Sequence, residues 1–251
     1  MTNIRTGFAW LDKLMPEGIS LNTSTMISGP GGSGKPLIGN AFATAWLKEG
    51  GSVVFMSLQY PSTDFIFSGI AALGTVDLNQ YLDHVKFIVL DPTINSIQSS
   101  GEEMKANLVK PDIWEMAIEQ ACSNVPDKGP GILVFGSALN LLLFSPTYSS
   151  SIKQKMENTI KEDKTRSYLF SVSTSARKEQ VSQLEDAADN LILTRSTKEP
   201  EFRLYLSITR LKDLPFSSEE IQVPFLPQAL GEVRAVAEHS RNRVIPLISK
   251  I

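Results

Sequence analysis

Cysteine and histidine are scarce in this chain of 251 residues. Cys122 is the only cysteine, so no internal disulfide can form, which predicts a protein of a reducing compartment such as the cytoplasm. We expect its thiol to be a small buried apolar group on a helix. The two histidines, His84 and His239, are far apart in the sequence and have no second ligand nearby, which argues against a metal site.

Long apolar runs and an excess of one charge are also missing. No segment approaches the ~18 uninterrupted apolar residues of a membrane-spanning helix, and the first residues are not followed by the apolar core of a signal peptide. The 24 Lys and Arg residues against 27 Asp and Glu residues leave a net charge of -3, which gives no general attraction to the nucleic-acid backbone. The expectation is therefore a cytoplasmic protein without a membrane partner.

The apolar residues that are present alternate between short strands and helices, as in parallel βαβ units. The sequence predicts parallel strands at 23–28, 52–58, 85–90, 131–135 and 167–173, with helices at 36–48, 62–73 and 111–122 and a polar, exposed helix at 149–163. It predicts a loop rich in Ser and Asn after residue 90.

A change to alternating apolar and polar residues marks the C-terminal part. Residues 190–195 and 202–208 predict an antiparallel hairpin across a turn at 198–200, which 219–225 can extend. Together these patterns predict an α/β fold with a mainly parallel central sheet, flanking helices and an antiparallel C-terminal extension. We expect one domain at 1–225 and a tail at 226–251, without a clear period, packed on the domain or on a partner.

A glycine-rich segment joins the first of these strands to the first helix with the spacing G-x-x-x-x-G-K. Its members are Gly29, Pro30, Gly31, Gly32, Ser33, Gly34 and Lys35. Such a loop lets backbone N–H groups converge on phosphate oxygens at a helix N-terminus, while the lysine neutralises the β and γ phosphates. The sequence therefore predicts a phosphate loop that can hold a phosphate or sulfate ion. A loop collapsed over Lys35, with its carbonyls facing the cavity, would instead indicate a vestigial site.

The position after the lysine departs from this pattern. Ser or Thr would supply a hydroxyl for Mg²⁺ there, and the chain has Pro36. Proline removes both that hydroxyl and one backbone N–H donor, although its fixed φ suits the first turn of a helix. The loop can keep its shape while losing function.

The start of the chain, TGFAWLDKL at 6–14, followed by Gly18-Ile19-Ser20 and the phosphate loop, resembles KaiC-type ATPases of the RecA superfamily. The resemblance continues to about residue 225 through 52–58, 132–144, 188–192 and 210–212. It implies a RecA-like P-loop fold, ATP bound at subunit interfaces, and ring-shaped assemblies.

The resemblance also implies where catalytic residues belong. The family has acidic residues after the strand that follows the first helix, where this chain has Gln59, and a Mg²⁺-holding Asp at the end of a later strand, where it has Gly136. Together with Pro36, these residues leave the chain without the hydroxyl and the carboxylate that would bind Mg²⁺ and without the general base that would activate water. The resemblance therefore indicates a pseudo-ATPase with a regulatory or scaffolding role, at most weak binding of ATP or ADP, and no tightly held Mg²⁺. The alternative is a RecA-type recombinase paralogue that binds DNA or modulates an active ATPase.

Partner contacts are implied at two further places. The family's Lys-x-Arg pair, which reaches the γ phosphate of a neighbouring subunit, corresponds to Arg210 and Lys212 in reversed order. These residues either contact a phosphate across an interface or form an ordinary exposed pair at a strand end. Residues 171–178 fall where RecA-like proteins carry a mobile loop facing the ring centre, so nucleic-acid contact stays an open alternative. We expect self-association as a ring or dimer, or association with an active ATPase relative.

Overall fold

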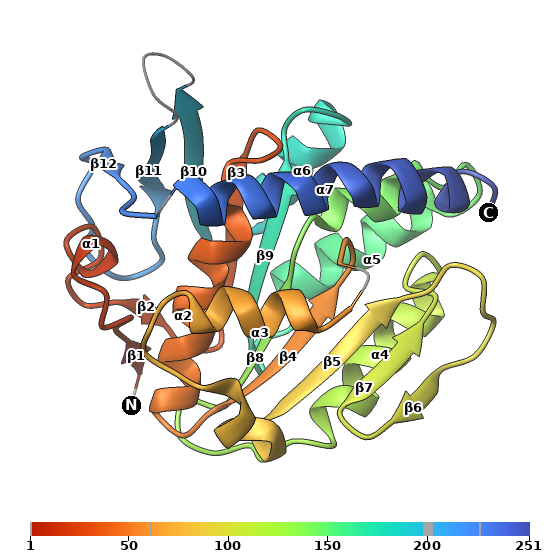
Figure 1. Ribbon diagram of the computed structural model, residues 1–251, viewed down its shortest axis with the longest axis horizontal. Helices are drawn as coiled ribbons and strands as arrows, with labels where there is room; N and C mark the ends of the chain where they lie inside the picture. Colours follow the sequence, from red (N-terminus) through yellow and green to blue (C-terminus); the bar gives the residue numbers. More distant parts are fainter. Residues whose placement is uncertain (1, 61, 198–202, 226) are drawn as a thin grey trace.

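A sheet of ten strands runs through the computed structural model, which describes residues 2–60, 62–197, 203–225 and 227–251 (Figure 1). Its strands, in spatial order, are β12 (Ile221–Gln222), β11 (Arg203–Arg210), β10 (Asn190–Thr197), β3 (Ser24–Gly29), β9 (Ser167–Ser173), β8 (Ile132–Gly136), β4 (Ser52–Ser57), β5 (Val85–Leu90), β7 (Glu103–Ala106) and β6 (Gln98–Ser100). A separate short ladder pairs β1 (Asn3–Ile4) with β2 (Ile19–Ser20).

The five predicted parallel strands are confirmed and lie side by side in the order β3-β9-β8-β4-β5. The predicted hairpin is confirmed as the antiparallel pair β10 and β11, extended by β12, and its predicted turn at 198–200 lies outside the described residues. The strand β10 also joins β3 in parallel. The chain therefore has the mainly parallel α/β sheet with an antiparallel C-terminal extension that the sequence predicted.

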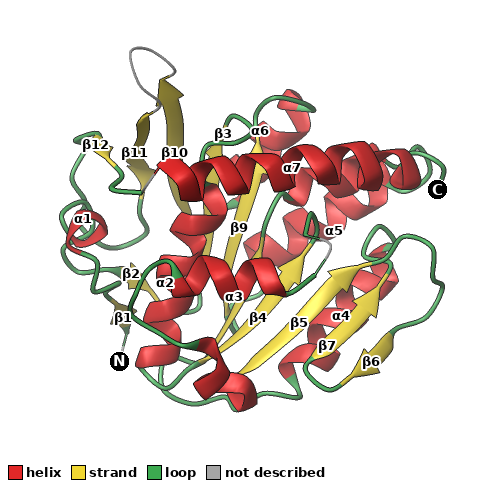
Figure 2. Cartoon of the chain, in the orientation of Figure 1, coloured by secondary structure: helices red, strands yellow, loops and turns green. Residues whose placement is uncertain are grey.

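Helices cover both faces of this sheet (Figure 2). They are α1 (Ala9–Asp12), α2 (Lys35–Lys48), α3 (Asp64–Ala71), α4 (Pro111–Cys122), α5 (Ser149–Glu162), α6 (Lys178–Ala187) and α7 (Pro227–Ile248), with the 3₁₀ segments η1 (Leu78–His84) and η2 (Leu139–Phe144). One apolar layer joins α2 and α3 to the sheet, and the other joins α4, α5 and α6 to its opposite face. The strands between these layers are buried on both sides, which explains their continuous apolar runs. None of the described helices is long and apolar enough to cross a bilayer.

Four segments differ from the sequence-based expectations. The Ser- and Asn-rich loop contains the short antiparallel pair β6 and β7, and α6 follows β9 at a place for which no helix was predicted. The helix α5 is not exposed all round, because Ile152, Met156 and Ile160 bury one of its faces. The tail, which has no clear period, forms the 22-residue helix α7. Each of these elements is stabilised by packing on distant segments, which local patterns do not reveal.

The helix α7 crosses the carboxyl ends of the central strands above β3 and β9, as the dark blue helix in Figure 1 shows. Val233 packs against the apolar layer of α2, whereas Val244, Ile245 and Ile248 pack against the layer of α4 and α5. The last residue is held as well, because Ser145 Oγ donates a hydrogen bond of 2.6 Å to the carbonyl of Ile251. The described apolar side chains of α7 thus pack against the two apolar layers of the same chain.

Candidate phosphate-binding site

The phosphate loop lies between the end of β3 and the start of α2, at the carboxyl edge of the parallel sheet. Glycine is required at its first position, because a Cβ on Gly29 would lie 2.1 Å from Thr194 Oγ1 and 2.3 Å from the Thr194 carbonyl oxygen. Gly34 immediately precedes α2 as its N-cap residue and lies in the left-handed region, at φ 64°. Pro36 occupies the first turn of α2, where its missing N–H breaks no helical hydrogen bond.

The Lys35 ammonium is folded back over its own loop. Its Nζ donates to the carbonyls of Gly29 at 2.9 Å and Pro30 at 2.7 Å, and to Ser33 Oγ at 3.1 Å. Burial, and then the positive charge of Arg241, lower the pKa of Lys35 to about 7. All three ammonium protons are therefore engaged, so a phosphate oxygen would have to displace a loop carbonyl to reach Nζ.

Several of the loop's backbone N–H groups are nevertheless available to donate to a ligand. The Gly31 N–H donates to Ser175 Oγ at 3.0 Å. Across the described part of the chain, no acceptor takes a hydrogen bond from the N–H of Gly32, Gly34 or Lys35. The loop therefore combines features of a collapsed loop and of an open phosphate loop. Its lysine is folded over loop carbonyls, as in a collapsed loop, while several of its amides have no acceptor, as in an open one. Anion binding at this loop stays a prediction.

A cavity of about 160 Å³ adjoins the loop, between the loop and α7. Its polar wall comes from η2, β9 and neighbouring loops and is formed by Ser33, Gln59, Asn140, Ser171, Ser173 and Ser175. Among the described residues that line it, Lys35 and Arg241 are the only ionisable ones. This cavity therefore carries positive charge and has no carboxylate on its wall.

The two positions at which the resemblance places catalytic carboxylates, Gln59 and Gly136, lie near the loop and carry no acidic side chain. Gln59 lines the cavity and is half-buried, so a neutral amide stands where a base is expected. Gly136 is buried at the end of β8, in register with Met56 on one side and Phe170 on the other. A Cβ at Gly136 would lie only 2.9 Å from Phe170 Cδ1, so the packing leaves no room for a carboxylate.

These residues do not fit a Mg²⁺ ion. Mg²⁺ in nucleotide sites is bound by one or two carboxylates together with phosphate oxygens, and it demands near-ideal octahedral geometry. Pro36 supplies no hydroxyl, and the described wall of the loop cavity supplies no carboxylate. A smaller adjoining cavity of about 60 Å³, lined mainly by apolar side chains, does include Glu232 of α7 beside Pro36.

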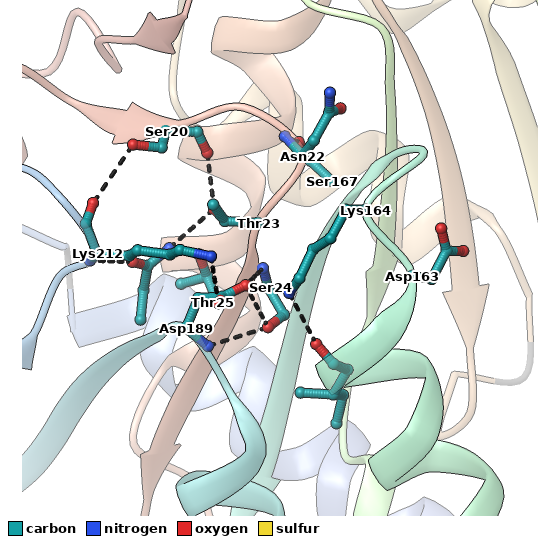
Figure 3. Close-up of polar contacts among 12 residues, drawn as sticks. Ser20, Asn22, Thr23, Ser24, Thr25, Asp163, Lys164, Ser167, Asp189 and Lys212 are labelled. Atoms are coloured by element: carbon teal, nitrogen blue, oxygen red, sulfur yellow. Dashed lines mark hydrogen bonds and ion pairs between the residues drawn. The ribbon is translucent and has the colours of Figure 1, made fainter.

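Arg210 and Lys212 lie at the opposite edge of the sheet. Arg210 Nη2 donates to the Glu185 carbonyl, and Lys212 Nζ pairs with Asp189 Oδ1 at 3.1 Å. Asp189 also accepts from Lys164 and from the Ser24 N–H, at the beginning of β3 (Figure 3). Since the six residues of β3 rise about 3.3 Å each, the pair lies roughly 20 Å from its own loop. Contact with a phosphate on a neighbouring copy stays a prediction.

Sequence reasoning missed Arg241 as a contributor to the cavity and did not connect the segment 171–178 with the phosphate loop. Arg241 lies on the tail, whose period was too weak to predict a helix, and no local signal links it to the loop. The segment 171–178, which the resemblance places where RecA-like proteins carry a mobile loop, contacts the phosphate loop: the Thr174 N–H donates to the Gly29 carbonyl at 3.0 Å, and Ser175 Oγ accepts from the Gly31 N–H. The structure thus ties this segment to the phosphate loop.

Comparisons with known proteins identify a matching family and a similar solved structure. The family model described as "ATPase: KaiC" matches residues 4–224, so α7 lies outside the matched part. A solved structure of a KaiC-like protein from the hyperthermophilic archaeon Pyrococcus horikoshii OT3 superposes with a TM-score of 0.66 and 14% identity, covering 88% of this chain and 93% of that chain. A search of curated proteins gave no significant match. On the match across residues 4–224, the chain belongs to the KaiC ATPase family.

Proposed function

We propose that this KaiC-family protein does not hydrolyse ATP and acts as a regulatory or scaffolding protein with at most weak binding of ATP or ADP. The observation that carries the proposal is the wall of the loop cavity, where the described residues include no carboxylate. Hydrolysis at a phosphate loop needs a metal ion to neutralise the developing charge and a group that activates or orients water. The cavity offers neither a carboxylate to anchor a metal nor one to act as a base.

Packing supports this proposal, because the substituted positions are filled rather than empty. Phe170 occupies the space beside Gly136, and Pro36 continues into a fully buried first turn of α2. Gln59 can orient a water molecule through its amide but cannot accept a proton as a carboxylate does. The changes lie on three separate elements, so no single replacement restores the machinery.

The proposed partner is another KaiC-type chain, either a second copy of this one or an active ATPase relative. Arg210 and Lys212 support this, since they lie at the edge of the sheet opposite the loop and can meet a phosphate only on a neighbouring chain. To do so, Lys212 must leave Asp189, with which it is paired in the single chain. Such an exchange of ion pairs would couple assembly to the occupancy of the neighbouring site.

The purified protein is expected to release phosphate from ATP no faster than a buffer control, because it lacks both the metal anchors and the base. Phosphate release with Mg²⁺ present is the measurement. The control is Lys35→Ala, since turnover by a contaminating ATPase survives this substitution. Turnover that disappears in Lys35→Ala would overturn the proposal.

Binding of ATP is expected to depend little on Mg²⁺, since the described wall of the cavity supplies no carboxylate for the ion. Calorimetric titrations with Mg²⁺ and with EDTA should give dissociation constants within tenfold of each other, about 1.4 kcal/mol. A larger requirement for Mg²⁺ would contradict the expectation and would show that other residues hold the metal. Gln59→Ala and Glu232→Gln would then identify which side chain has taken over.

A further inference from the structure

Among the described residues of α7 that line the loop cavity, one is charged and the others are apolar. Val233, Ala237, Arg241, Ile245 and Ile248 follow at intervals of four, four, four and three residues, so they share one stripe of the helix. Val233, Ala237, Arg241 and Ile245 all line the loop cavity, and Ile248 is fully buried beyond it. The stripe thus places the guanidinium of Arg241, an exposed residue, at the cavity beside the phosphate loop.

The Arg241 guanidinium contacts the loop directly. A Cβ added to Gly31 would lie 2.3 Å from Arg241 Nη2 and 3.5 Å from Ser173 Oγ, so the guanidinium stands against the bare Cα of this glycine. Its charge also reaches Lys35, whose pKa it helps to lower. Among the side chains that the structure describes, no carboxylate pairs with either cation.

Two neighbouring cations without a counter-ion form an unfavourable arrangement. Like charges close together raise the free energy of both, and the repulsion grows where water is excluded. Lys35 is only 6% exposed, so it is largely removed from water. An anion that contacted both cations would relieve this repulsion and would also meet the free N–H groups of the loop. The site is therefore complementary to a small, multiply charged anion.

We propose that Arg241 is a phosphate-binding residue that supplies, from the same chain, the positive charge which a metal ion supplies at an intact site of this kind. The inference rests on the proposed function, because it assigns a ligand class to the same loop. Guanidinium binds phosphate through paired N–H donors and stays charged at any physiological pH. The ligand is a metal-free diphosphate-type anion held between Lys35, Arg241 and the loop amides.

The size of the cavity favours the free anion over a nucleotide. Pockets for drug-sized ligands measure about 300–1,000 Å³, whereas this one encloses about 160 Å³ beneath α7. An inorganic anion needs little movement of α7, but a nucleotide requires the helix to shift from its packed position. The expected order of affinity is therefore pyrophosphate above ADP when no metal is present.

Calorimetric titration of the full chain with sodium pyrophosphate tests the proposal, in EDTA, at low ionic strength and below pH 7, where Lys35 is charged. We expect binding without metal, a loss of affinity of about tenfold or more in Arg241→Gln, and a smaller loss in Arg241→Lys. The matched control is Arg243→Gln, because Arg243 lies on the same helix, is exposed and does not line the cavity. Circular dichroism establishes that each variant keeps its fold.

Three outcomes would overturn the proposal: no binding in EDTA, binding that appears only with Mg²⁺, or equal affinity in Arg241→Gln and Arg243→Gln. A parallel titration with ADP separates the two sources of a diphosphate. Weaker ADP binding supports the free anion, and tighter ADP binding that depends on Arg241 would overturn the free anion in favour of a nucleotide. Failure here is distinguishable from failure of the proposed function, which the rate of ATP hydrolysis decides independently.

Discussion

Replacing Gly136 by aspartate is expected to destabilise the fold by about 4 kcal/mol instead of restoring a metal site. The new Cβ would lie 2.9 Å from Phe170 Cδ1, and Phe170 is itself fixed between Trp114 and Tyr168 with only 1% exposure. Overpacking a core in this way costs about 1–3 kcal/mol, and a buried polar group without a partner costs a further ~1–3 kcal/mol. Chemical denaturation measures the loss, and an ATPase assay should show no gain.

Two further variants separate the steric cost from the electrostatic one. Gly136→Ala introduces the same Cβ without a charge, so it should lose only the ~1–3 kcal/mol of overpacking. Adding Phe170→Ala to Gly136→Asp removes the clash, so the double variant should be less destabilised than the sum of the single variants by ~1 kcal/mol or more. A Gly136→Asp protein as stable as the wild type, or one that gains Mg²⁺-dependent hydrolysis, would contradict this account of the site.

Sulfate binding to the loop is expected to weaken on the order of tenfold per pH unit above pH 7 and to be constant below it. Burial, followed by the charge of Arg241, lowers the pKa of Lys35 from the ordinary 10.5 to about 7, so the ammonium loses its proton above that pH. The other ionisable residue described on the cavity wall is Arg241, and guanidinium groups in general do not titrate in this pH range. Sulfate is a dianion throughout this range, so a change in affinity reports on the protein alone.

Proton linkage gives an independent check on this expectation. An anion restores the charged form of Lys35, so binding above pH 7 should take up a proton, which calorimetry in buffers of different ionisation enthalpy detects. Lys35→Gln should abolish both the proton uptake and the pH dependence.

The sign of the pH dependence of folding stability follows from the same pKa. The lysine of the unfolded chain keeps its proton to about pH 10.5, so the free energy of unfolding should rise between about pH 7 and 10. An affinity for sulfate that does not change with pH would contradict the lowered pKa of Lys35.

Much of this fold could be predicted from local sequence, because the signals for its central elements are local. The strands β3, β4, β5, β8 and β9 lie between two apolar layers, and burial on both faces produces short apolar runs bounded by turns. The glycines and lysine of the phosphate loop occupy fixed spacings, since the turn between a strand and a helix allows few alternatives. The chemistry of residues 36, 59 and 136 is equally visible, because residue identity alone shows that they carry no hydroxyl and no carboxylate.

The placement of the side chains around the phosphate loop was decided by tertiary structure. No pattern in the sequence indicates that the ammonium of Lys35 turns onto the carbonyls of Gly29 and Pro30, or that Phe170 fills the space beside Gly136. The placement of α7 is the clearest case, because Arg241 and Gly31 are brought together across 210 positions of sequence. Sequence by itself determined that Pro36, Gln59 and Gly136 carry neither a hydroxyl nor a carboxylate, since that depends on residue type. Only the packing of α7 on the edge of the sheet decided which group lies over the loop, because such contacts join residues that share no local period.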